Sequence, residues 1–289
     1  MSLKEATRIL LELNKVKITF AVTLTTIAGY VLAKNSFDSG LIMPVIGIFI
    51  LACGSAALNH YQDRDKDKLM KRTISRPIPS GKISPTAVLL ISVFEIILGT
   101  YIIYAGSNFL AAQLGLLAVI WYNGIYTPLK RKTAFAVVPG SIIGAIPPMV
   151  GWVSGGGLLT DPKLFVLAFF FFIWQVPHFW LLMLKYGKEY EEAGYPSITS
   201  MISKQQIKRA TFMWTSATAV TALMIPVSGL MSTVFFKITI VLASVWLIVV
   251  FAGLLTHKKD EFNPFYYFMR INYFVLIMII ALSIDPLFG

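Results

Sequence analysis

The chain has 289 residues, of which 56% are hydrophobic and only 13% are charged. A soluble domain usually carries about 25% charged residues, and the apolar residues here form long blocks, so the composition excludes an ordinary soluble protein. The net charge of +11 does not indicate nucleic-acid binding, because the basic residues gather between apolar blocks, as in proteins whose loop charges set their membrane orientation.

Nine apolar segments are each long enough to cross a bilayer as a helix, which takes about 20 residues. Unbroken runs of this length exclude the alternating pattern of a membrane barrel, and only a helix then satisfies the backbone polar groups in lipid. We therefore expect an all-α integral membrane bundle, a single polytopic domain over residues 1–289. The expected spans are about 17–34, 41–60, 86–105, 108–127, 134–153, 164–184, 210–229, 235–255 and 269–287.

The segment before the first span, residues 1–16, is predicted to be a helix that lies in the membrane interface. Its apolar residues Leu3, Ala6, Leu10 and Leu13 follow the spacing of one helix face. The apolar run that follows is too long for a signal peptide and lacks a small-residue cleavage site. We therefore expect this run to be the first membrane span.

The basic residues are divided unevenly between the two sides of the membrane. With a cytoplasmic N-terminus, every Lys and Arg except Lys34, Lys163 and Lys237 falls on the cytoplasmic side, as the positive-inside rule requires. Nine spans then put the C-terminus outside. The long charged connections of about 61–85 and 185–209 face the cytoplasm. Such loops are usually functional or disordered, and these two are expected on the same side of the membrane.

The first of these connections follows a motif of three polar residues. Asn59, Asp63 and Asp67 are spaced four residues apart, which puts them along one face of a helix. Two carboxylates so placed repel each other, unless a divalent cation lies between them. Oxygen ligands suit Mg²⁺, or Mn²⁺. The alternative is a solvated charged turn in which nearby lysines pair with the aspartates, and the motif alone fits both interpretations.

Two groups of basic residues follow this motif. Arg72 and Arg76 are again four apart, before "RPIPSG" breaks the helix. Because a guanidinium binds phosphate bidentately, carboxylates followed by arginines are typical of a Mg²⁺–diphosphate site. Tyr126, Lys130 and Arg131, in "YTPLKRKT" at the end of the fourth span, are candidates to contact the same diphosphate. They are equally well explained as charges that set the topology.

The second long connection begins with further candidates. Glu189 lies just past the sixth span and is a candidate catalytic residue that supplies another metal oxygen. Lys185 and Lys188 are candidate phosphate contacts, and Tyr190 lies beside them. Because both charged connections are expected on one side of the membrane, we expect them to close over one pocket.

The sixth span contains a histidine within its apolar run. His178 lies among aromatic residues in "FFFFIWQVPHFW", close to Trp174 and Gln175. Ionisable residues at this depth are rare and indicate function by default. His178 is therefore a candidate to ligate a haem iron or to line a flat aromatic pocket. The alternative is a core histidine that bonds to a neighbouring helix.

Taken in order, these motifs resemble the UbiA-type intramembrane prenyltransferases, and among them the branch that modifies haem. The family's N-x3-D-x3-D motif matches Asn59, Asp63 and Asp67, and "MKRTISRPIPSG" matches the segment that follows it. The haem branch is matched by "YTPLKRKT", "GAIPPMVGW", "WQVPHFW" and "LKYGKEY", so the resemblance covers nearly the whole chain. The second D-x3-D motif of the quinone prenyltransferases is absent. Its place is taken by Lys185, Lys188, Glu189 and Tyr190.

The resemblance implies that a farnesyl group passes from farnesyl diphosphate to a vinyl group of haem B, with addition of water, to give haem O. Haem B is then a substrate rather than a prosthetic group, and Mg²⁺ is the cofactor. The expected partners also include the lipid bilayer, haem A synthase and oxidase assembly factors. The implied metal ligands are Asn59, Asp63 and Asp67. The implied diphosphate contacts are Arg72, Arg76, Tyr126, Lys130, Arg131, Lys185 and Lys188. The implied haem contacts are Trp174, Gln175, His178 and Tyr190.

Two other functions compete with this interpretation. The first is a prenyltransferase of the same family that acts on a quinone precursor, such as a hydroxybenzoate or a naphthoate. The intramembrane His178 and the missing second D-x3-D motif argue against it. The second is a membrane haem transporter or chaperone without catalysis, which accounts for the spans and the histidine but not for a carboxylate face followed by two arginines.

Overall fold

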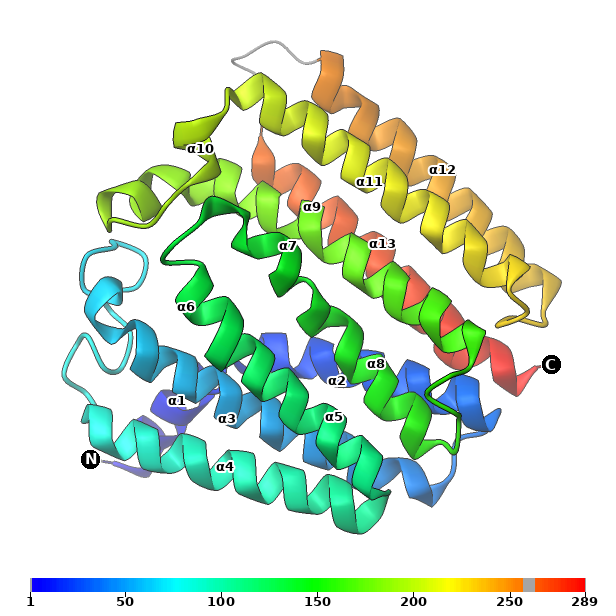
Figure 1. The fold of residues 1–289 in the computed structure, drawn as a ribbon, viewed down its shortest axis with the longest axis horizontal. Coiled ribbons are helices and arrows are strands. Elements are labelled where there is room, and N and C mark those ends of the chain that lie inside the picture. The colour runs from blue at the N-terminus through cyan, green and yellow to red at the C-terminus, as the bar shows by residue number, and fades with distance from the viewer. Residues whose placement is uncertain (1, 257–262, 289) are drawn as a thin grey trace.

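The computed structural model describes residues 2–256 and 263–288, and every regular element within these ranges is a helix. Nine of the helical segments so described are long and apolar enough to cross a membrane. The predicted all-α membrane fold is therefore confirmed, and the bundle is shown in Figure 1. Lys258 and Lys259, which the topology argument counted as cytoplasmic, lie outside the described residues.

Each predicted span corresponds to one helix or to one run of consecutive helical pieces. The helices are α1 (Leu3–Leu13), α2 (Val16–Lys34), η1 (Ser39–Leu41), α3 (Ile42–Asp67), α4 (Pro85–Gly106), α5 (Phe109–Val119), η2 (Ile120–Tyr126), α6 (Thr127–Leu129), η3 (Ala134–Ala136), α7 (Val137–Gly140), α8 (Ile142–Ser154), α9 (Pro162–Glu192), α10 (Ile198–Met201), α11 (Lys204–Val227), α12 (Val234–Thr256), α13 (Pro264–Ile284) and η5 (Asp285–Leu287).

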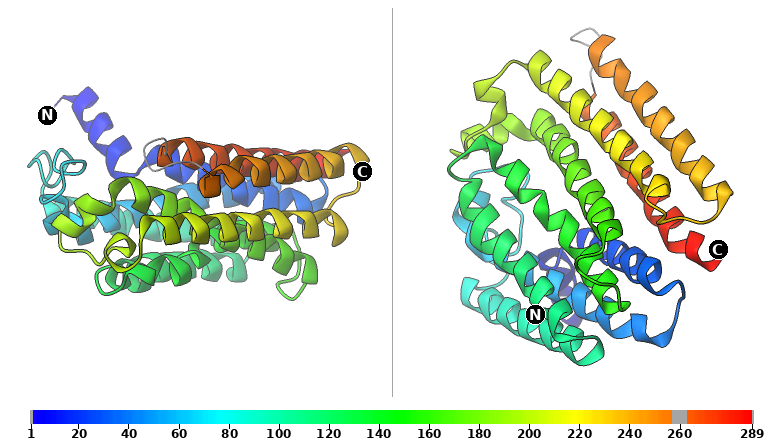
Figure 2. Two further views of the ribbon diagram at one scale, coloured as in Figure 1. Left: turned by 90° about the horizontal axis from the view of Figure 1, so that it is seen from above. Right: turned by 45° about the vertical axis from the view of Figure 1, so that its right-hand side comes forward.

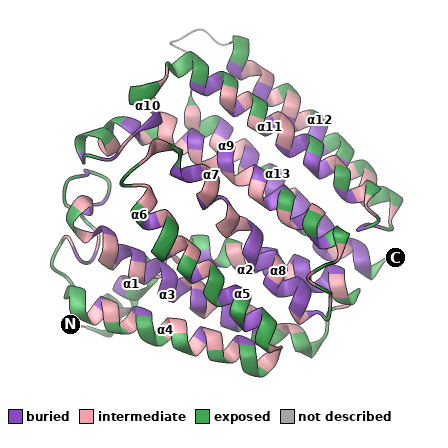
Figure 3. Cartoon of the chain, viewed as in Figure 1, coloured by how far each residue is buried: buried purple, intermediate pink, exposed green. Residues whose placement is uncertain are grey.

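The long helices lie side by side in a flattened bundle (Figure 2). One core cluster joins α9, α11, α12 and α13 and contains the fully buried Phe170, Phe251 and Phe274. A second joins α3, α5 and α8 around Leu51 and Val150. Figure 3 shows the buried residues along the facing sides of these helices, with exposed residues on the outer sides, as expected of a bundle whose outer surface contacts lipid.

Helices α2 and α8 pack closely because glycines form their contact. A Cβ atom added to Gly29 would lie 2.0 Å from the carbonyl oxygen of Pro148, and one added to Gly151 would lie 1.9 Å from that of Thr26. Close packing of backbones at small residues is the usual way in which membrane helices associate. This contact joins the half of the bundle that contains α3 to the half that contains α9.

Two helices extend well beyond their predicted spans. α3 continues to Asp67 and α9 to Glu192, because polar residues carry each helix past its apolar run. The predicted connections 61–85 and 185–209 were therefore too wide, and the segments between long helices are 68–84 and 193–203. Both lie at the same end of the bundle, on the left of Figure 1.

The fourth and fifth spans are not continuous α-helices. In the fourth, α5 passes into the π-helical turn η2, which ends at Tyr126. In the fifth, the helix is interrupted at Ser141, between α7 and α8. π-Helical turns shift the side-chain register of a helix and are frequent at functional sites. The turn in the fourth span places the residues that follow it, including Thr127, against α3.

The N-terminal segment forms the predicted helix, α1, but only part of the predicted apolar face packs on the bundle. Leu13 is buried together with Ile9, in a cluster with Ala57 of α3. Leu3 and Leu10 are exposed. α1 projects from the flat bundle in the left view of Figure 2, and its location in the membrane interface stays a prediction.

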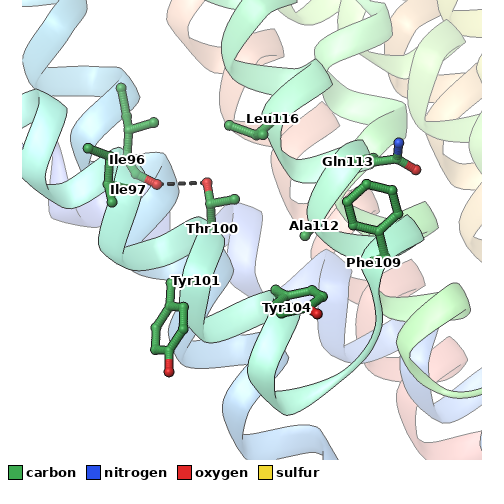
Figure 4. Close-up of a pocket in the computed structure, with 9 residues that line it drawn as sticks. All are labelled: Ile96, Ile97, Thr100, Tyr101, Tyr104, Phe109, Ala112, Gln113 and Leu116. Carbon is green, nitrogen blue, oxygen red and sulfur yellow. Dashed lines mark hydrogen bonds between the residues drawn. The ribbon is translucent and has the colours of Figure 1, made fainter.

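An apolar groove lies between α4 and α5, near the turn that joins them (Figure 4). Its volume is about 440 Å³, and it is lined by side chains such as Ile97, Tyr101, Tyr104 and Phe109. The groove lies near the ends of α4 and α5 that are far from Asn59, Asp63 and Asp67 on α3. It contains no charged side chain, so it is not the candidate site.

Candidate active site

The C-terminal end of α3 presents the three-residue motif as one buried helix face, as predicted. Asn59, Asp63 and Asp67 are only 3%, 4% and 1% exposed. The Asn59 amide donates a hydrogen bond to Asp63 Oδ2 at 2.9 Å and another to Thr127 Oγ1 at 3.2 Å. Burial of two carboxylates is costly unless cations or hydrogen bonds compensate for the lost water. The site supplies both.

Three basic side chains compensate for the two aspartates. The Lys130 ammonium makes an ion pair with Asp63 Oδ2, and Arg131 contacts Asp63 Oδ1 at 3.2 Å. Arg76 donates from Nη1 to both oxygens of Asp67, at 2.9 and 2.8 Å. These basic residues do more than set the membrane orientation of the chain, because Arg76, Lys130 and Arg131 form ion pairs with the aspartates. Lys68 instead pairs with the exposed Asp65.

The sequence did not single out Lys15, which also belongs to this cluster. Its ammonium donates to Asn59 Oδ1 at 2.9 Å. Burial, together with the positive charges of Arg76 and Lys130, lowers the pKa of Lys15 from its ordinary 10.5 to about 7. Lys15 lies in the short turn between α1 and α2. No sequence motif around it indicated that the turn meets α3.

Polar side chains of the fourth span hold α3 in position. Asn123, inside the π-helical turn, accepts a hydrogen bond from Ser55 at 2.6 Å and donates to Gln62 Oε1 at 3.0 Å. Gln62 in turn donates to the carbonyl oxygen of Asn123 at 2.9 Å. These bonds fix the register of α3 against the turn, so that Lys130 reaches Asp63. No residue pattern predicted this network, since a π-helical turn has no distinctive sequence.

The segment 193–203 contacts both the segment 68–84, where Met70 packs with Ala193 and Tyr195, and the end of α3, as the expected position of the two connections on one side suggested. Lys66 donates to the carbonyl oxygen of Ala193 at 2.8 Å. Tyr195, which the sequence did not single out, donates to Asp63 Oδ1 at 3.3 Å. Burial, together with the charge of the Asp63 carboxylate, raises the pKa of the Tyr195 phenol, so the phenol stays protonated and can donate.

Two predicted residues of α9, Glu189 and Tyr190, contact Arg72 rather than the aspartates. Glu189 Oε2 accepts a hydrogen bond from the backbone N–H of Arg72 at 3.3 Å, and the Tyr190 hydroxyl lies 3.5 Å from the Arg72 guanidinium. The Lys185 ammonium lies over the ring of Phe265, 4.3 Å from its centroid, and Lys188 is exposed. Glu189 as a metal ligand and the two lysines as phosphate contacts therefore stay predictions.

His178 lies in a half-buried aromatic cluster on α9. The ring centroids of Trp174 and Phe268 are 5.1 and 4.7 Å from that of the imidazole, and Asn272 of α13 lies beside His178. The buried atoms His178 Nδ1, Trp174 Nε1 and Gln175 Oε1 find no partner among the described residues. Buried polar atoms usually have a partner, so unsatisfied ones grouped in this way are candidates to bind water, an ion or a ligand. The alternative of a core histidine bonded to a neighbouring helix therefore lacks a bond at Nδ1.

Aromatic rings connect this cluster to the aspartates. The ring of Tyr126 lies 6.1 Å from that of Phe179, and the latter lies 5.7 Å from His178. Lys130 lies over the Tyr126 ring at 5.8 Å. Ring contacts therefore run without a break from the aspartates and their cations, the charged end, to the histidine cluster, the histidine end.

The oxygen donors at the charged end fit a magnesium ion whose coordination a substrate completes. Among the described residues no group of three or more His, Cys, Asp or Glu side chains is arranged to hold a metal. Asp63 and Asp67 supply two carboxylates, and the Asn59 amide a further oxygen. Mg²⁺ is usually bound in this manner, by one or two carboxylates together with phosphate oxygens of a substrate.

Comparisons with known proteins agree with this geometry. The model of the UbiA prenyltransferase family matches residues 22–274. A protoheme IX farnesyltransferase of Geobacter sulfurreducens is 37% identical over 72% of this chain and 77% of its own length. One of Opitutus terrae is 32% identical over 96% and 94%, respectively.

Solved structures share the fold at low sequence identity. A structure described as digeranylgeranylglyceryl phosphate synthase has a TM-score of 0.79 at 16% identity, covering 98% of this chain and 99% of the other. A UbiA homologue from Archaeoglobus fulgidus bound to DMAPP and Mg²⁺ has a TM-score of 0.75 at 13% identity, covering 96% and 98%. With nine membrane-length helices in the described ranges and a family match over most of the chain, this multi-pass membrane protein belongs to the UbiA prenyltransferase family.

Proposed function

We propose that this prenyltransferase moves a farnesyl group from farnesyl diphosphate to a vinyl group of haem B, with addition of water, and so makes haem O. One observation supports the proposal: a buried carboxylate face with paired cations is connected through the rings of Tyr126 and Phe179 to a histidine cluster with unsatisfied polar atoms. The names of the relatives at 37% and 32% identity support the choice of donor and acceptor.

The charged end binds the diphosphate. Arg76, Lys130 and Arg131 surround the aspartates, and Arg72 lies on the adjoining segment near Tyr190. When the donor binds, these cations exchange part of their contact with carboxylate for contact with phosphate oxygens. They then stabilise the negative charge that grows on the leaving group.

Asn59, Asp63 and Asp67 are proposed to hold Mg²⁺, with Mn²⁺ as a possible substitute. Held by these residues, a metal ion would supply positive charge that favours departure of the diphosphate. The A. fulgidus neighbour, described as bound to DMAPP and Mg²⁺, supports this proposal. Whether Glu189 joins the metal ligands depends on its release from the Arg72 backbone.

The histidine end is proposed to bind haem B. Three buried polar atoms there have no partner among the described residues: His178 Nδ1, Trp174 Nε1 and Gln175 Oε1. A porphyrin has an iron ion and propionates that such atoms can bind, and a flat ring that aromatic side chains can contact. Asn272 lies beside the imidazole and is proposed to orient it, as residues behind a metal-binding histidine commonly do. Tyr190, on the same helix, is proposed to contact the acceptor where it meets the donor.

The reaction proceeds by cleavage of the C1–O bond of farnesyl diphosphate, whose electron pair leaves with the diphosphate. A haem vinyl group then donates its π electrons to the allylic C1, and the new carbocation lies next to the porphyrin. Water adds to this carbocation and loses a proton, which gives the hydroxyethylfarnesyl side chain. The aromatic walls exclude other water from the allylic cation until the bond to haem has formed.

We also propose a membrane arrangement for the single domain. The α3, α6 and α9 ends that carry the site face the cytoplasm at the inner membrane, the C-terminus lies outside, and α1 lies in the interface, as the distribution of Lys and Arg indicates. Farnesyl diphosphate and haem B, both poorly soluble, enter from the bilayer side. Haem A synthase and oxidase assembly factors are the proposed partners for the product.

The test is to incubate the purified protein in lipid nanodiscs with farnesyl diphosphate, Mg²⁺ and haem B, and to identify the pigment by mass spectrometry. We expect haem O. A parallel reaction replaces haem B by a hydroxybenzoate or a naphthoate. Prenylation of the aromatic acid without haem O would overturn the acceptor, and haem binding without any prenyl transfer would favour a haem carrier.

A further inference from the structure

An acidic residue midway along α4 plays no part in the site as described so far. Glu95 lies within the membrane-length helix Pro85–Gly106, where an ionisable side chain is costly and indicates function by default. Its Oε1 accepts a hydrogen bond from Asn14 Nδ2 at 2.8 Å. Glu95 Oε2 and Asn14 Oδ1 are buried and have no partner among the described residues. This bond couples α4 to the turn between α1 and α2.

Glu95 reaches the turn because α3 and α4 pack closely at a glycine. A Cβ atom added to Gly54 of α3 would lie 2.9 Å from the Glu95 Cβ and 2.8 Å from the backbone nitrogen of Ile96. Any larger residue at Gly54 would therefore push α4 away. The glycine brings the carboxylate within reach of Asn14, the residue that ends α1.

The residue after Asn14 has an unusual backbone conformation. Lys15 has φ 45° and ψ 46°, the left-handed region that residues other than glycine, asparagine and aspartate seldom adopt. This conformation turns the chain between α1 and α2 and directs the Lys15 ammonium to Asn59 Oδ1, at 2.9 Å. Asn59 in turn donates to Asp63. A backbone conformation of this kind persists only when its surroundings hold it, and the Asn14–Glu95 bond is next to it in the chain.

We propose that Lys15 is a further diphosphate-binding residue and that Glu95 is its positioning residue, which acts by holding Asn14 and so the turn that presents Lys15. The inference rests on the proposed function in one respect, namely that the donor is a prenyl diphosphate. It adds a cation from the N-terminal turn to those of the segments 68–84 and 127–133. It also gives the intramembrane carboxylate a role that does not require contact with either substrate.

The test measures binding of a farnesyl diphosphate analogue that cannot ionise, with Mg²⁺ and without haem, to the full chain in nanodiscs. Lys15→Met should weaken binding about tenfold or more, the size expected of a hydrogen bond to a charged group. Glu95→Leu should weaken it to a similar extent. Glu95→Gln should restore most of the affinity, because its amide oxygen still accepts from Asn14. The double variant Glu95→Leu/Lys15→Met should bind no more weakly than Lys15→Met alone.

Thr100→Val is the matched control on the same helix. The Thr100 hydroxyl donates to the carbonyl oxygen of Ile96 within α4, so its removal should leave the affinity unchanged. The inference is overturned if Glu95→Leu behaves as Thr100→Val does, if Glu95→Gln binds as weakly as Glu95→Leu, or if the effects of Glu95→Leu and Lys15→Met add in the double variant. Additive losses would mean that Glu95 only stabilises the fold.

The haem assay on the same proteins separates this inference from the proposed function. If the unaltered protein binds the analogue with the expected dependence on Lys15 and Glu95 but makes no haem O, the acceptor proposal fails and the positioning role stands. If haem O is made at equal donor KM by the unaltered protein, Lys15→Met and Glu95→Leu, the proposed function stands and the positioning role fails.

Discussion

Arg76 donates from one nitrogen to both oxygens of Asp67, at 2.9 and 2.8 Å, and the aspartate is 1% exposed. The pair ties the segment that follows α3 to the end of that helix, since Arg76 lies nine residues beyond Asp67. Two cations compete for the Asp67 carboxylate in the proposed site. The same carboxylate is proposed to bind Mg²⁺, so the guanidinium must release part of its contact when metal and diphosphate arrive.

Arg76→Ala is expected to impair both the fold and the reaction. Breaking a buried ion pair from one side commonly costs about 3 kcal/mol, because Asp67 is left without its cation. Thermal unfolding should therefore shift downward, and the KM for farnesyl diphosphate should rise. Addition of Mg²⁺ should recover part of the lost stability, since the freed carboxylate gains another cation. A variant as stable as the unaltered protein, with unchanged donor KM, would contradict this account.

Asp63→Ala is expected to abolish prenyl transfer while the protein stays folded in the membrane. Asp63 is the point where Asn59, Lys130 and Tyr195 meet, and the proposed metal loses a carboxylate ligand. Asp67→Ala should behave in the same way. Turnover is measured as haem O formed, with retention of the folded protein followed by size-exclusion chromatography.

Asp65→Ala serves as the control for both aspartate variants. Its side chain is 72% exposed and makes only distant surface pairs with Arg64 and Lys68, which contribute little to stability. We expect normal turnover in this variant. Full activity in Asp63→Ala and Asp67→Ala as well would refute the metal-site proposal.

Chelation should stop prenyl transfer without removing haem. EDTA takes away the ion proposed at Asn59, Asp63 and Asp67, whereas the unsatisfied atoms proposed to bind haem belong to α9. The Soret absorption of bound haem B should therefore persist while haem O formation ceases. Addition of Mg²⁺ or Mn²⁺ should restore haem O formation. If metal analysis shows that the chelated sample contains no divalent ion and turnover is undiminished, the ion takes no part in the reaction.

The helices and the carboxylate face were predictable because both depend on local sequence. Apolar runs determine the spans, and four-residue spacing places Asn59, Asp63 and Asp67 on one face wherever the helix continues. Lys15 and Tyr195 were not predictable, because they reach the motif through tertiary packing across 44 and 132 residues of chain. The π-helical turn was also missed, since its residues read as an ordinary apolar helix, and only packing against Gln62 and Ser55 reveals the shifted register.

Tyr195→Phe tests one of the residues that only the fold revealed. The change removes the hydroxyl that donates to Asp63 Oδ1 at 3.3 Å but keeps the ring beside Tyr190. One hydrogen bond of this kind is worth about 1 kcal/mol, so kcat/KM for farnesyl diphosphate should fall severalfold while haem affinity is retained. A loss as complete as that of Asp63→Ala would instead give the phenol a direct part in the chemistry.

His178→Ala is expected to weaken haem B binding and to leave binding of the farnesyl diphosphate analogue unchanged. The imidazole nitrogen Nδ1 is buried without a partner among the described residues, and Asn272 already engages the ring, so loss of the ring removes the proposed haem ligand. Haem affinity is followed by the Soret band in titrations. The matched control is His60→Ala, which removes another buried histidine without a described partner, on α3. If both variants bind haem as the unaltered protein does, His178 is a core residue; if only His178→Ala loses affinity, haem binds at the α9 end of the site.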